Sequence, residues 1–135
     1  MRRACIDIGS NTTRLLVAEC DEVGLREVLQ QRTFTRIGRD VLRSGAISEA
    51  KIEEVVGVVE RQLGIARKLG AERTAGVATA AIRIASNGAE LVDAIHERCG
   101  LRIAILAPEE EARLAFLGAA RTLGHVPEGP PVRSR

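Results

Sequence analysis

Residues 6–19 read IDIGSNTTRLLVAE. Two apolar stretches with strand-like composition flank residues 9–12 (GSNT), which favour a turn. A turn of small residues exposes backbone N–H groups that can surround one anion. Asp7, inside the first stretch, would repel a bare phosphate but suits one that is bridged by a divalent cation. The stretch therefore indicates either a metal-assisted phosphate loop or a plain hairpin turn in which Asp7 bonds to local backbone.

The composition is that of a globular protein with an aliphatic core. Of the 135 residues, 45% are hydrophobic and 28% are charged, which favours one compact domain over disorder. The chain has two Phe and neither Tyr nor Trp, which counts against a platform that stacks single-stranded bases. A formal net charge of +2 without a basic run gives no reason to expect a nucleic-acid partner.

The cysteines and the apolar stretches indicate the cellular compartment in which the protein is expected. The three cysteines are far apart in sequence and form no CxxC pair, which indicates reduced thiols. Nothing in the sequence approaches 18 consecutive apolar residues, so no membrane partner is expected. We expect a cytoplasmic protein.

Outward from the opening stretch, the pattern predicts three strands followed by a loop. The strands cover residues 3–8, 13–20 and 25–34, and the connections are short enough for antiparallel hairpins. Arg14 is expected on a solvent face of the second strand. The segment TRIGRDVLRSGA (35–46), rich in Gly, Arg and Ser, is predicted to be a loop.

A long helix follows that loop. Ser48 offers an N-cap, an apolar stripe follows at helical spacing, and Gly70 ends the helix. Gly57 and Gly64 lie inside it at a cost of about 1 kcal/mol each. Two explanations for these glycines stay open: close packing against a neighbouring element, or chance.

Strands and helices then alternate. Residues 73–79 and 101–106 read as buried strands, and a short segment, 80–85, follows the first of them. Asn87 and Glu90 resemble a capping box for a helix that reaches Cys99. A last helix is predicted from Pro108 to Gly124.

The element order β-β-β-α-β-α-β-α indicates the fold class. Right-handed βαβ crossovers after the hairpins give an α/β domain with a mixed five-stranded sheet. Its three N-terminal strands are antiparallel, and helices lie on both faces.

Four segments resemble one family. Residues 7–12 are similar to the first phosphate loop, Asp-x-Gly-Ser-Asn-Ser/Thr, of the exopolyphosphatase / guanosine pentaphosphate phosphohydrolase (Ppx/GppA) family. Sugar kinases of the same superfamily usually carry Asp-x-Gly-Thr-Thr, so the Ser-Asn pair favours the phosphatase branch. The segments TRIGRDVLRSGAIS, VATAAIRIASNG and ILAPEEEARLAFLGA resemble later segments of that family, in the same order. The resemblance implies the N-terminal lobe of an actin-like ATPase (ribonuclease H-like) fold.

The resemblance also implies roles for individual residues. Glu111 would be the catalytic base that takes a proton from the attacking water, and Arg83 would hold phosphoryl oxygens. Glu110 is one residue away, and the sequence leaves the choice of base between the two open. Asp7 would serve a metal, Mg²⁺ or another divalent cation. The phosphate-binding residues would be Gly9, Ser10, Asn11 and Thr12.

The resemblance finally implies a two-lobed enzyme. Residues 3–124 would form the N-terminal lobe and 125–135 a linker towards a second lobe, so the 135-residue chain alone is expected to be inactive. The whole protein would hydrolyse the terminal phosphoanhydride of inorganic polyphosphate. Hydrolysis of guanosine pentaphosphate is one alternative. Another is a non-catalytic fragment that binds phosphate or associates with itself as a homodimer.

Overall fold

The fold is built on one mixed five-stranded sheet. The computed structural model describes residues 1–114. The strands are β1 (Arg2–Ile8), β2 (Thr12–Cys20), β3 (Leu25–Phe34), β4 (Arg73–Ala78) and β5 (Ile103–Ile105). Their spatial order is β3-β2-β1-β4-β5, with antiparallel pairing in the first three and parallel pairing of β1 with β4 and of β4 with β5. The α/β class and the N-terminal hairpins are confirmed, while β5 is shorter than the predicted 101–106.

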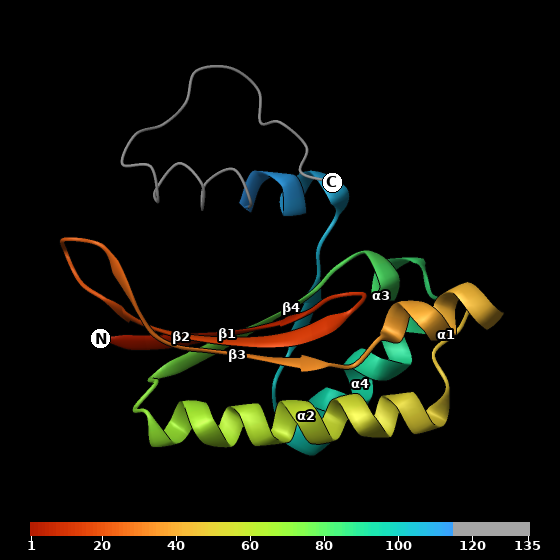
Figure 1. Ribbon diagram of the computed structural model, residues 1–135, viewed down its shortest axis with the longest axis horizontal. Coiled ribbons are helices and arrows are strands. Elements are labelled where there is room, and N and C mark those ends of the chain that lie inside the picture. Colours follow the sequence, from red (N-terminus) through yellow and green to blue (C-terminus); the bar gives the residue numbers. More distant parts are fainter. Residues whose placement is uncertain (115–135) are drawn as a thin grey trace.

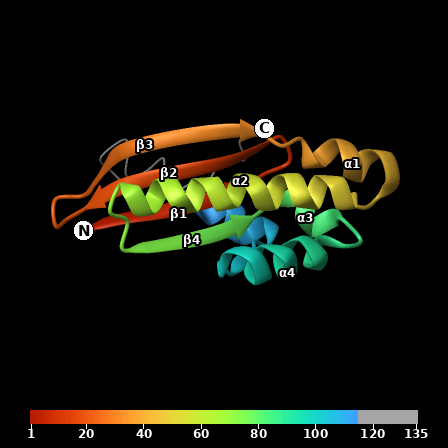
Figure 2. The same ribbon diagram turned by 90° about the horizontal axis from the view of Figure 1, so that it is seen from below.

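Helices cover both faces of this sheet and adjoin one of its ends (Figure 1). They are α1 (Ile37–Ser44), α2 (Glu49–Lys68), α3 (Ala80–Ile84) and α4 (Gly88–Cys99), and residues 108–114 are also helical. Both α2 and α4 lie under one face, as Figure 2 shows from below. Helical residues 108–114 lie over the opposite face. None of the described helices is both long and apolar enough to cross a bilayer.

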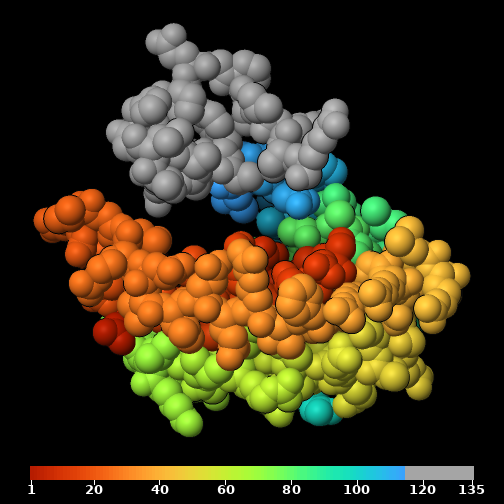
Figure 3. Space-filling view, viewed as in Figure 1, coloured from red at the N-terminus to blue at the C-terminus, as the bar shows by residue number. Residues whose placement is uncertain are grey.

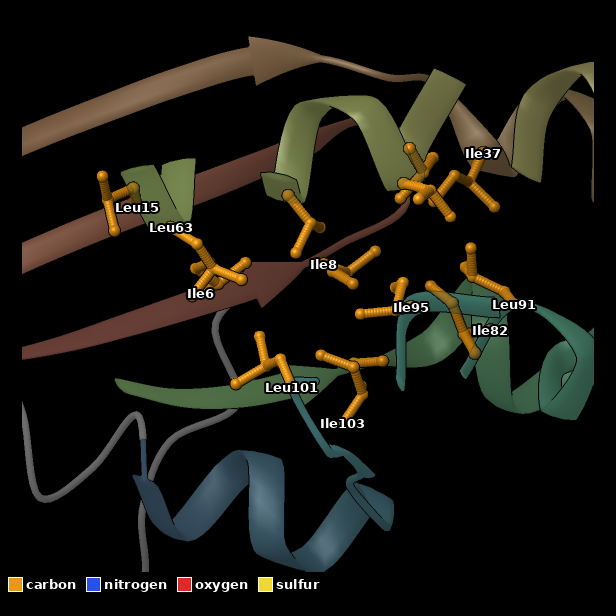
Figure 4. Close-up of a cluster of buried hydrophobic side chains, with 14 of the residues drawn as sticks. Ile6, Ile8, Leu15, Ile37, Leu63, Ile82, Leu91, Ile95, Leu101 and Ile103 are labelled. Atoms are coloured by element: carbon orange, nitrogen blue, oxygen red, sulfur yellow. The ribbon is translucent and has the colours of Figure 1, made fainter. Parts of the chain in front are cut away.

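The core fills the space between the sheet and α2 with α4 (Figure 4). On β1 the side chains of Ala4, Ile6 and Ile8 face this space, because alternate residues of a strand point to the same face. Leu63 of α2 and Ile95 of α4 meet them from the helix side. Each fully buried aliphatic side chain stabilises the fold by about 1.5–3 kcal/mol. The intervening residues of β1 therefore point to the other face of the sheet.

Helix α1 corrects the prediction of a loop at 35–46. Its composition resembles a loop, but its position is stabilised by tertiary contacts. Ile37 is buried, and the N–H of Gly38 donates to the carbonyl of Ser10 at 2.8 Å. Asp40 accepts hydrogen bonds from the hydroxyl and the N–H of Ser48, at 2.7 and 3.1 Å, which lower the pKa of its carboxyl. These contacts join α1 to the loop before β2 and to the start of α2.

The predicted capping box at the start of α4 is wrong, although the helix itself is confirmed. Asn87 occupies the N-cap position, but its side chain makes no capping hydrogen bond. Its amide group instead bonds to both backbone groups of Ile47, accepting at 2.8 Å and donating at 2.9 Å. Asn87 therefore ties α4 to the segment before α2. By contrast, the predicted cap of α2 is confirmed, because the Ser48 hydroxyl accepts from the N–H of Lys51.

The structure describes only part of the predicted C-terminal helix. The helix predicted from Pro108 is confirmed over 108–114, and its continuation to Gly124 lies outside the described residues. The lobe boundary at 124 and the linker 125–135 also lie outside them, and they stay predictions.

Candidate functional site

The first half of the candidate site comes from the β1–β2 hairpin. Asp7 and Arg14 are direct partners in the antiparallel register, so their side chains share one face of the sheet. That face is the one opposite α2, because Ile6 and Ile8 on either side of Asp7 are buried against α2. Nη2 of Arg14 lies 3.4 Å from Oδ2 of Asp7. The side chain of Arg14 is 40% exposed, as expected for a solvent face, and it also lies beside the predicted metal ligand.

The second half comes from two segments far from the hairpin in sequence. Arg83, in α3, donates from Nη1 to the carbonyl of Leu106 at 2.6 Å. The same nitrogen lies 3.5 Å from Oε2 of Glu111. The loop after β5 thus fixes the guanidinium of Arg83 and places Glu111 next to it.

The helix that begins at Pro108 places the two candidate bases, Glu110 and Glu111, in different surroundings. Glu110 is exposed, and its carboxylate accepts a hydrogen bond from the N–H of Ala107 at 3.3 Å. A glutamate at the third helical position that bonds back to the N-cap N–H is a capping arrangement. Glu111 instead lines the cavity described next. The geometry therefore favours Glu111 as the residue that faces a ligand.

The first half and Glu111 of the second half line one cavity of about 360 Å³, whose lining does not include Arg83. Its polar side chains are those of Asp7, Arg14, Thr79 and Glu111, and Leu106 lies among them. The remaining lining residues are Cys5, Leu16, Val77 and Leu114. Guanidinium groups bind phosphoryl oxygens well, and carboxylates can accept a proton or hold a cation. The cavity thus combines the groups that phosphate chemistry requires.

Asp7 is electrostatically unusual within this cavity. Burial raises the pKa of its carboxyl, Arg14 offsets part of that rise, and the negative charge of Glu111 adds to it. Its Oδ1 atom is buried and has no hydrogen-bond partner among the described residues. Burial and the charge of Asp7 likewise raise the pKa of the neighbouring Cys5 thiol, which stays in its neutral form. A buried acceptor without a partner is costly unless something binds it.

The carboxylate chemistry of the cavity is compatible with Mg²⁺. In phosphate enzymes this ion is usually held by one or two carboxylates, by waters and by the substrate phosphates. Asp7, whose Oδ1 has no hydrogen-bond partner among the described residues, would supply one carboxylate. Residues 1–114 contain no group of three or more His, Cys, Asp or Glu placed to hold a metal without such help.

The predicted phosphate loop lies at the edge of the cavity rather than in its lining. The carbonyl of Ser10 accepts from Gly38, and the carbonyl of Asn11 accepts from the N–H groups of Thr35 and Arg36 at 3.1 and 3.0 Å. The N–H groups of Ser10 and Asn11 themselves donate to no backbone acceptor among the described residues. The loop is therefore held by its carbonyls and leaves these N–H groups available to an anion.

Two further loop residues show how the loop adjoins the cavity. Thr12 is the first residue of β2, and its carbonyl accepts the N–H of Gly9 at 2.9 Å. A side chain at Gly9 would lie 3.9 Å from the hydroxyl of Thr79, which lines the cavity. The structure thus brings Asp7, Arg83 and Glu111 together. The loop of residues 9–12 adjoins the cavity at Thr79.

Sequence reasoning gave Arg14 and Thr79 no role, although both line the cavity. A signal for Arg14 was present, because Asp7 and Arg14 are equally far from the centre of the turn at Ser10 and Asn11. A hairpin with that turn pairs them directly. Thr79 belongs to the segment VATAAIRIASNG that resembles the family, and it reaches the cavity because β4 lies beside β1.

Comparisons with known proteins agree over most of the chain. The model of the Ppx/GppA phosphatase family matches residues 16–130. An uncharacterised protein of Streptomyces coelicolor is 33% identical over 124 residues, covering 92% of this chain and 37% of that protein. Exopolyphosphatase 1 of Mycobacterium tuberculosis is 28% identical over 125 residues, covering 92% of this chain and 36% of that enzyme.

A solved structure gives the same result. The chain matches the crystal structure of the Aquifex aeolicus member of the Ppx/GppA family with a TM-score of 0.87 and 36% identity. The match covers 96% of this chain and 42% of that one. The chain therefore spans between 36% and 42% of the length of these three relatives.

Proposed function

This chain belongs to the Ppx/GppA phosphatase family and has its actin-like fold, and we propose that it forms the N-terminal half of a phosphoanhydride hydrolase. The substrate we propose is inorganic polyphosphate, from which the enzyme removes the terminal phosphate. Support for this choice comes from the relative named exopolyphosphatase 1.

One observation carries the proposal. Three side chains that the sequence separates, Asp7, Arg83 and Glu111, converge on the same side of the sheet. They come from β1, from α3 and from the helix after β5. Two carboxylates beside a fixed guanidinium suit an anionic substrate with a cation and a water.

In the proposed reaction each group has one task. The N–H groups of Ser10 and Asn11 bind phosphoryl oxygens at the edge of the cavity. Arg83 holds the terminal phosphoryl group and offsets charge as the bond to the next phosphate breaks. Glu111 orients the water and takes its proton as the oxygen bonds to phosphorus. The bridging oxygen leaves with the shortened polyphosphate, and orthophosphate is released.

In this proposal Asp7 is the residue that would bind the divalent cation. Mg²⁺ would neutralise phosphate charge beside the Asp7 carboxylate. Asp7 would hold it through its carboxylate, of which Oδ1 lacks a hydrogen-bond partner among the described residues.

The second lobe would supply the other side of the site. An isolated half loses most of the positioning on which phosphoryl transfer depends. Guanosine pentaphosphate ends in the same phosphoanhydride and is the second candidate substrate.

The test compares phosphate release from long-chain polyphosphate and from guanosine pentaphosphate, with Mg²⁺. The full-length gene product and the 135-residue chain are assayed side by side. We expect release from polyphosphate by the full-length product and none by the chain alone. Release from neither substrate by the full-length product would contradict the proposed function.

Glu111→Gln in the full-length product tests the proposed base. Loss of a general base lowers kcat by about 10²- to 10⁴-fold. Glu110→Gln is the matched control, because glutamine at the same helical position preserves the capping bond. The assignment fails if Glu110→Gln loses activity and Glu111→Gln keeps it.

A further inference from the structure

The core contains three buried polar side chains that the proposed reaction does not use. Within residues 1–114, only Thr13, Thr35 and Gln62 are both polar and buried, with at most 1% of each exposed. The rest of the core between the sheet and α2 is aliphatic (Figure 4). Burying a polar group costs free energy unless the group finds a hydrogen-bond partner. These three residues therefore require an explanation.

Hydrogen bonds join the three residues to one another. The hydroxyl groups of Thr13 and Thr35 share a hydrogen bond of 2.9 Å. Nε2 of Gln62, on α2, donates to the carbonyl of Thr13 at 3.1 Å. The three residues thus form one buried polar cluster, which connects the start of β2, the residue after β3 and α2.

The buried polar cluster adjoins the loop of residues 9–12. Thr13 follows that loop directly in sequence. The N–H groups of Thr35 and of Arg36 beside it donate to the carbonyl of Asn11, at 3.1 and 3.0 Å. Both threonines of the cluster are therefore attached to the loop, one through the chain and one through a hydrogen bond.

Stability alone does not account for the cluster. Oε1 of Gln62 is buried and has no hydrogen-bond partner among the described residues. Such an acceptor keeps its cost of desolvation, whereas apolar groups of the same shape in place of a hydrogen-bonded pair are nearly neutral or stabilising. A buried polar network instead favours one backbone arrangement, because its hydrogen bonds are satisfied only there.

We propose that the buried polar cluster positions the phosphate loop, so that Thr13, Thr35 and Gln62 are positioning residues of the site. Ser10 and Asn11 are exposed, and the cluster keeps their N–H groups directed towards an anion. The inference rests on the proposed function, because it concerns the same loop. It adds that α2, on the far face of the sheet from Asp7, helps to set how tightly the loop binds substrate.

The test compares two double variants of the full-length gene product that change the threonines in opposite ways. Thr13→Val/Thr35→Val keeps their shape and removes both hydroxyl groups, whereas Thr13→Ser/Thr35→Ser keeps the hydroxyl groups and removes the methyl groups. The first should raise KM for polyphosphate about tenfold and change kcat less than about twofold, because the loop binds substrate and transition state alike. Its melting temperature should not fall. The second should melt lower, because it leaves cavities, and should keep the parent KM.

Gln62→Met tests the third member of the cluster. It removes the donor to the carbonyl of Thr13 together with the acceptor that has no partner, so KM should rise while the melting temperature does not fall. Val59→Ala is the matched control, because Val59 is fully buried about one turn earlier in α2. It should lower the melting temperature and leave KM unchanged. If KM instead follows the melting temperature across these variants, the cluster serves stability only, and the inference is wrong.

Hydrogen exchange of the protein without ligand separates this inference from the proposed function. The N–H groups of Thr35 and Arg36 measure how firmly the carbonyl of Asn11 is held. By NMR they should exchange about tenfold faster in Thr13→Val/Thr35→Val than in the parent. An unchanged KM in this variant, with a parent that hydrolyses polyphosphate, overturns only the role of the cluster. A parent that releases no phosphate contradicts the proposed function, and the exchange rates then decide whether the cluster holds the loop.

Discussion

At the scale of single residues, Asp7 combines a functional position with a cost to stability. Burial raises the pKa of its carboxyl above the ordinary 3.8 because the charged form loses solvation. The native state therefore binds a proton more tightly than the unfolded chain. The stability that Asp7 contributes is present below pH 3.8 and is lost as the pH rises through the raised pKa. At neutral pH the ionised Asp7 destabilises the fold relative to a neutral side chain.

We expect Asp7→Asn to melt a few degrees higher than the parent at pH 7, because it removes this charge and keeps the shape. The difference should shrink as the pH falls through the raised pKa and should vanish below 3.8, where both side chains are neutral. Circular dichroism melting from pH 3 to pH 8 measures it. Phosphate release by the same variant should fall if Asp7 holds the cation.

Asp93→Asn is the control for this series. Asp93 is an exposed carboxylate on α4, and surface substitutions usually change stability by less than about 0.5 kcal/mol. Its melting curve should follow that of the parent at each pH. A lower melting temperature for Asp7→Asn at pH 7 would show that the bond to Arg14 outweighs the cost of burial.

At the scale of elements, two glycines in helices have opposite surroundings. A methyl group at Gly64, inside α2, would meet no atom within 4 Å. At Gly88, the first residue of α4, it would collide with the backbone carbonyl of Ile82. Close packing therefore explains Gly88 and does not explain Gly64.

Gly64→Ala should raise the free energy of unfolding by about 1 kcal/mol, because alanine restricts the unfolded chain and favours the helix. Gly88→Ala should lower it by about 1–3 kcal/mol, since α3 and α4 must move apart. Urea unfolding of the two variants and the parent measures both. Destabilisation by Gly64→Ala would mean that α2 needs flexibility at this point.

At the scale of the whole molecule, the sheet has a protected centre and an open edge. Strand β1 is paired on both sides, with β2 and with β4, and its inward side chains are buried. Strand β3 is paired only with β2 among the described residues. Figure 3 shows the orange atoms of this region on the molecular surface. Leu25 and Phe34 at its two ends are exposed.

Hydrogen exchange should therefore be slowest in β1, β4 and the middle of α2. It should be fastest in residues 21–24 and along the outer edge of β3, where N–H groups open without global unfolding. Exchange followed by mass spectrometry of peptides measures this order. Protection of β3 equal to that of β1, increasing with protein concentration, would instead indicate that two copies pair along this edge. That outcome would support the self-associating alternative.

Local patterns in the sequence were sufficient for the strands, for most helices and for the aliphatic core. The hairpins β1–β2–β3 follow from runs of strand-forming residues and short turns, which depend on neighbours in sequence. The start of α2 at Ser48 and the end of α4 at Gly100 follow from capping chemistry, which is equally local. These features needed no long-range contact to be recognised.

The tertiary structure decided the rest, because the deciding partners are far away in sequence. Helix α1 forms at a loop-like composition since Ile37 is buried and Gly38 bonds to Ser10. Arg83 meets Glu111 only because the chain after β5 returns beside α3. The phase of the helix that begins at Pro108 turns Glu111, and not Glu110, towards the cavity. The sequence by itself thus determined most of the elements and named Asp7, Arg83 and Glu111 as candidates, and only the packing of distant segments assembled these residues into one site.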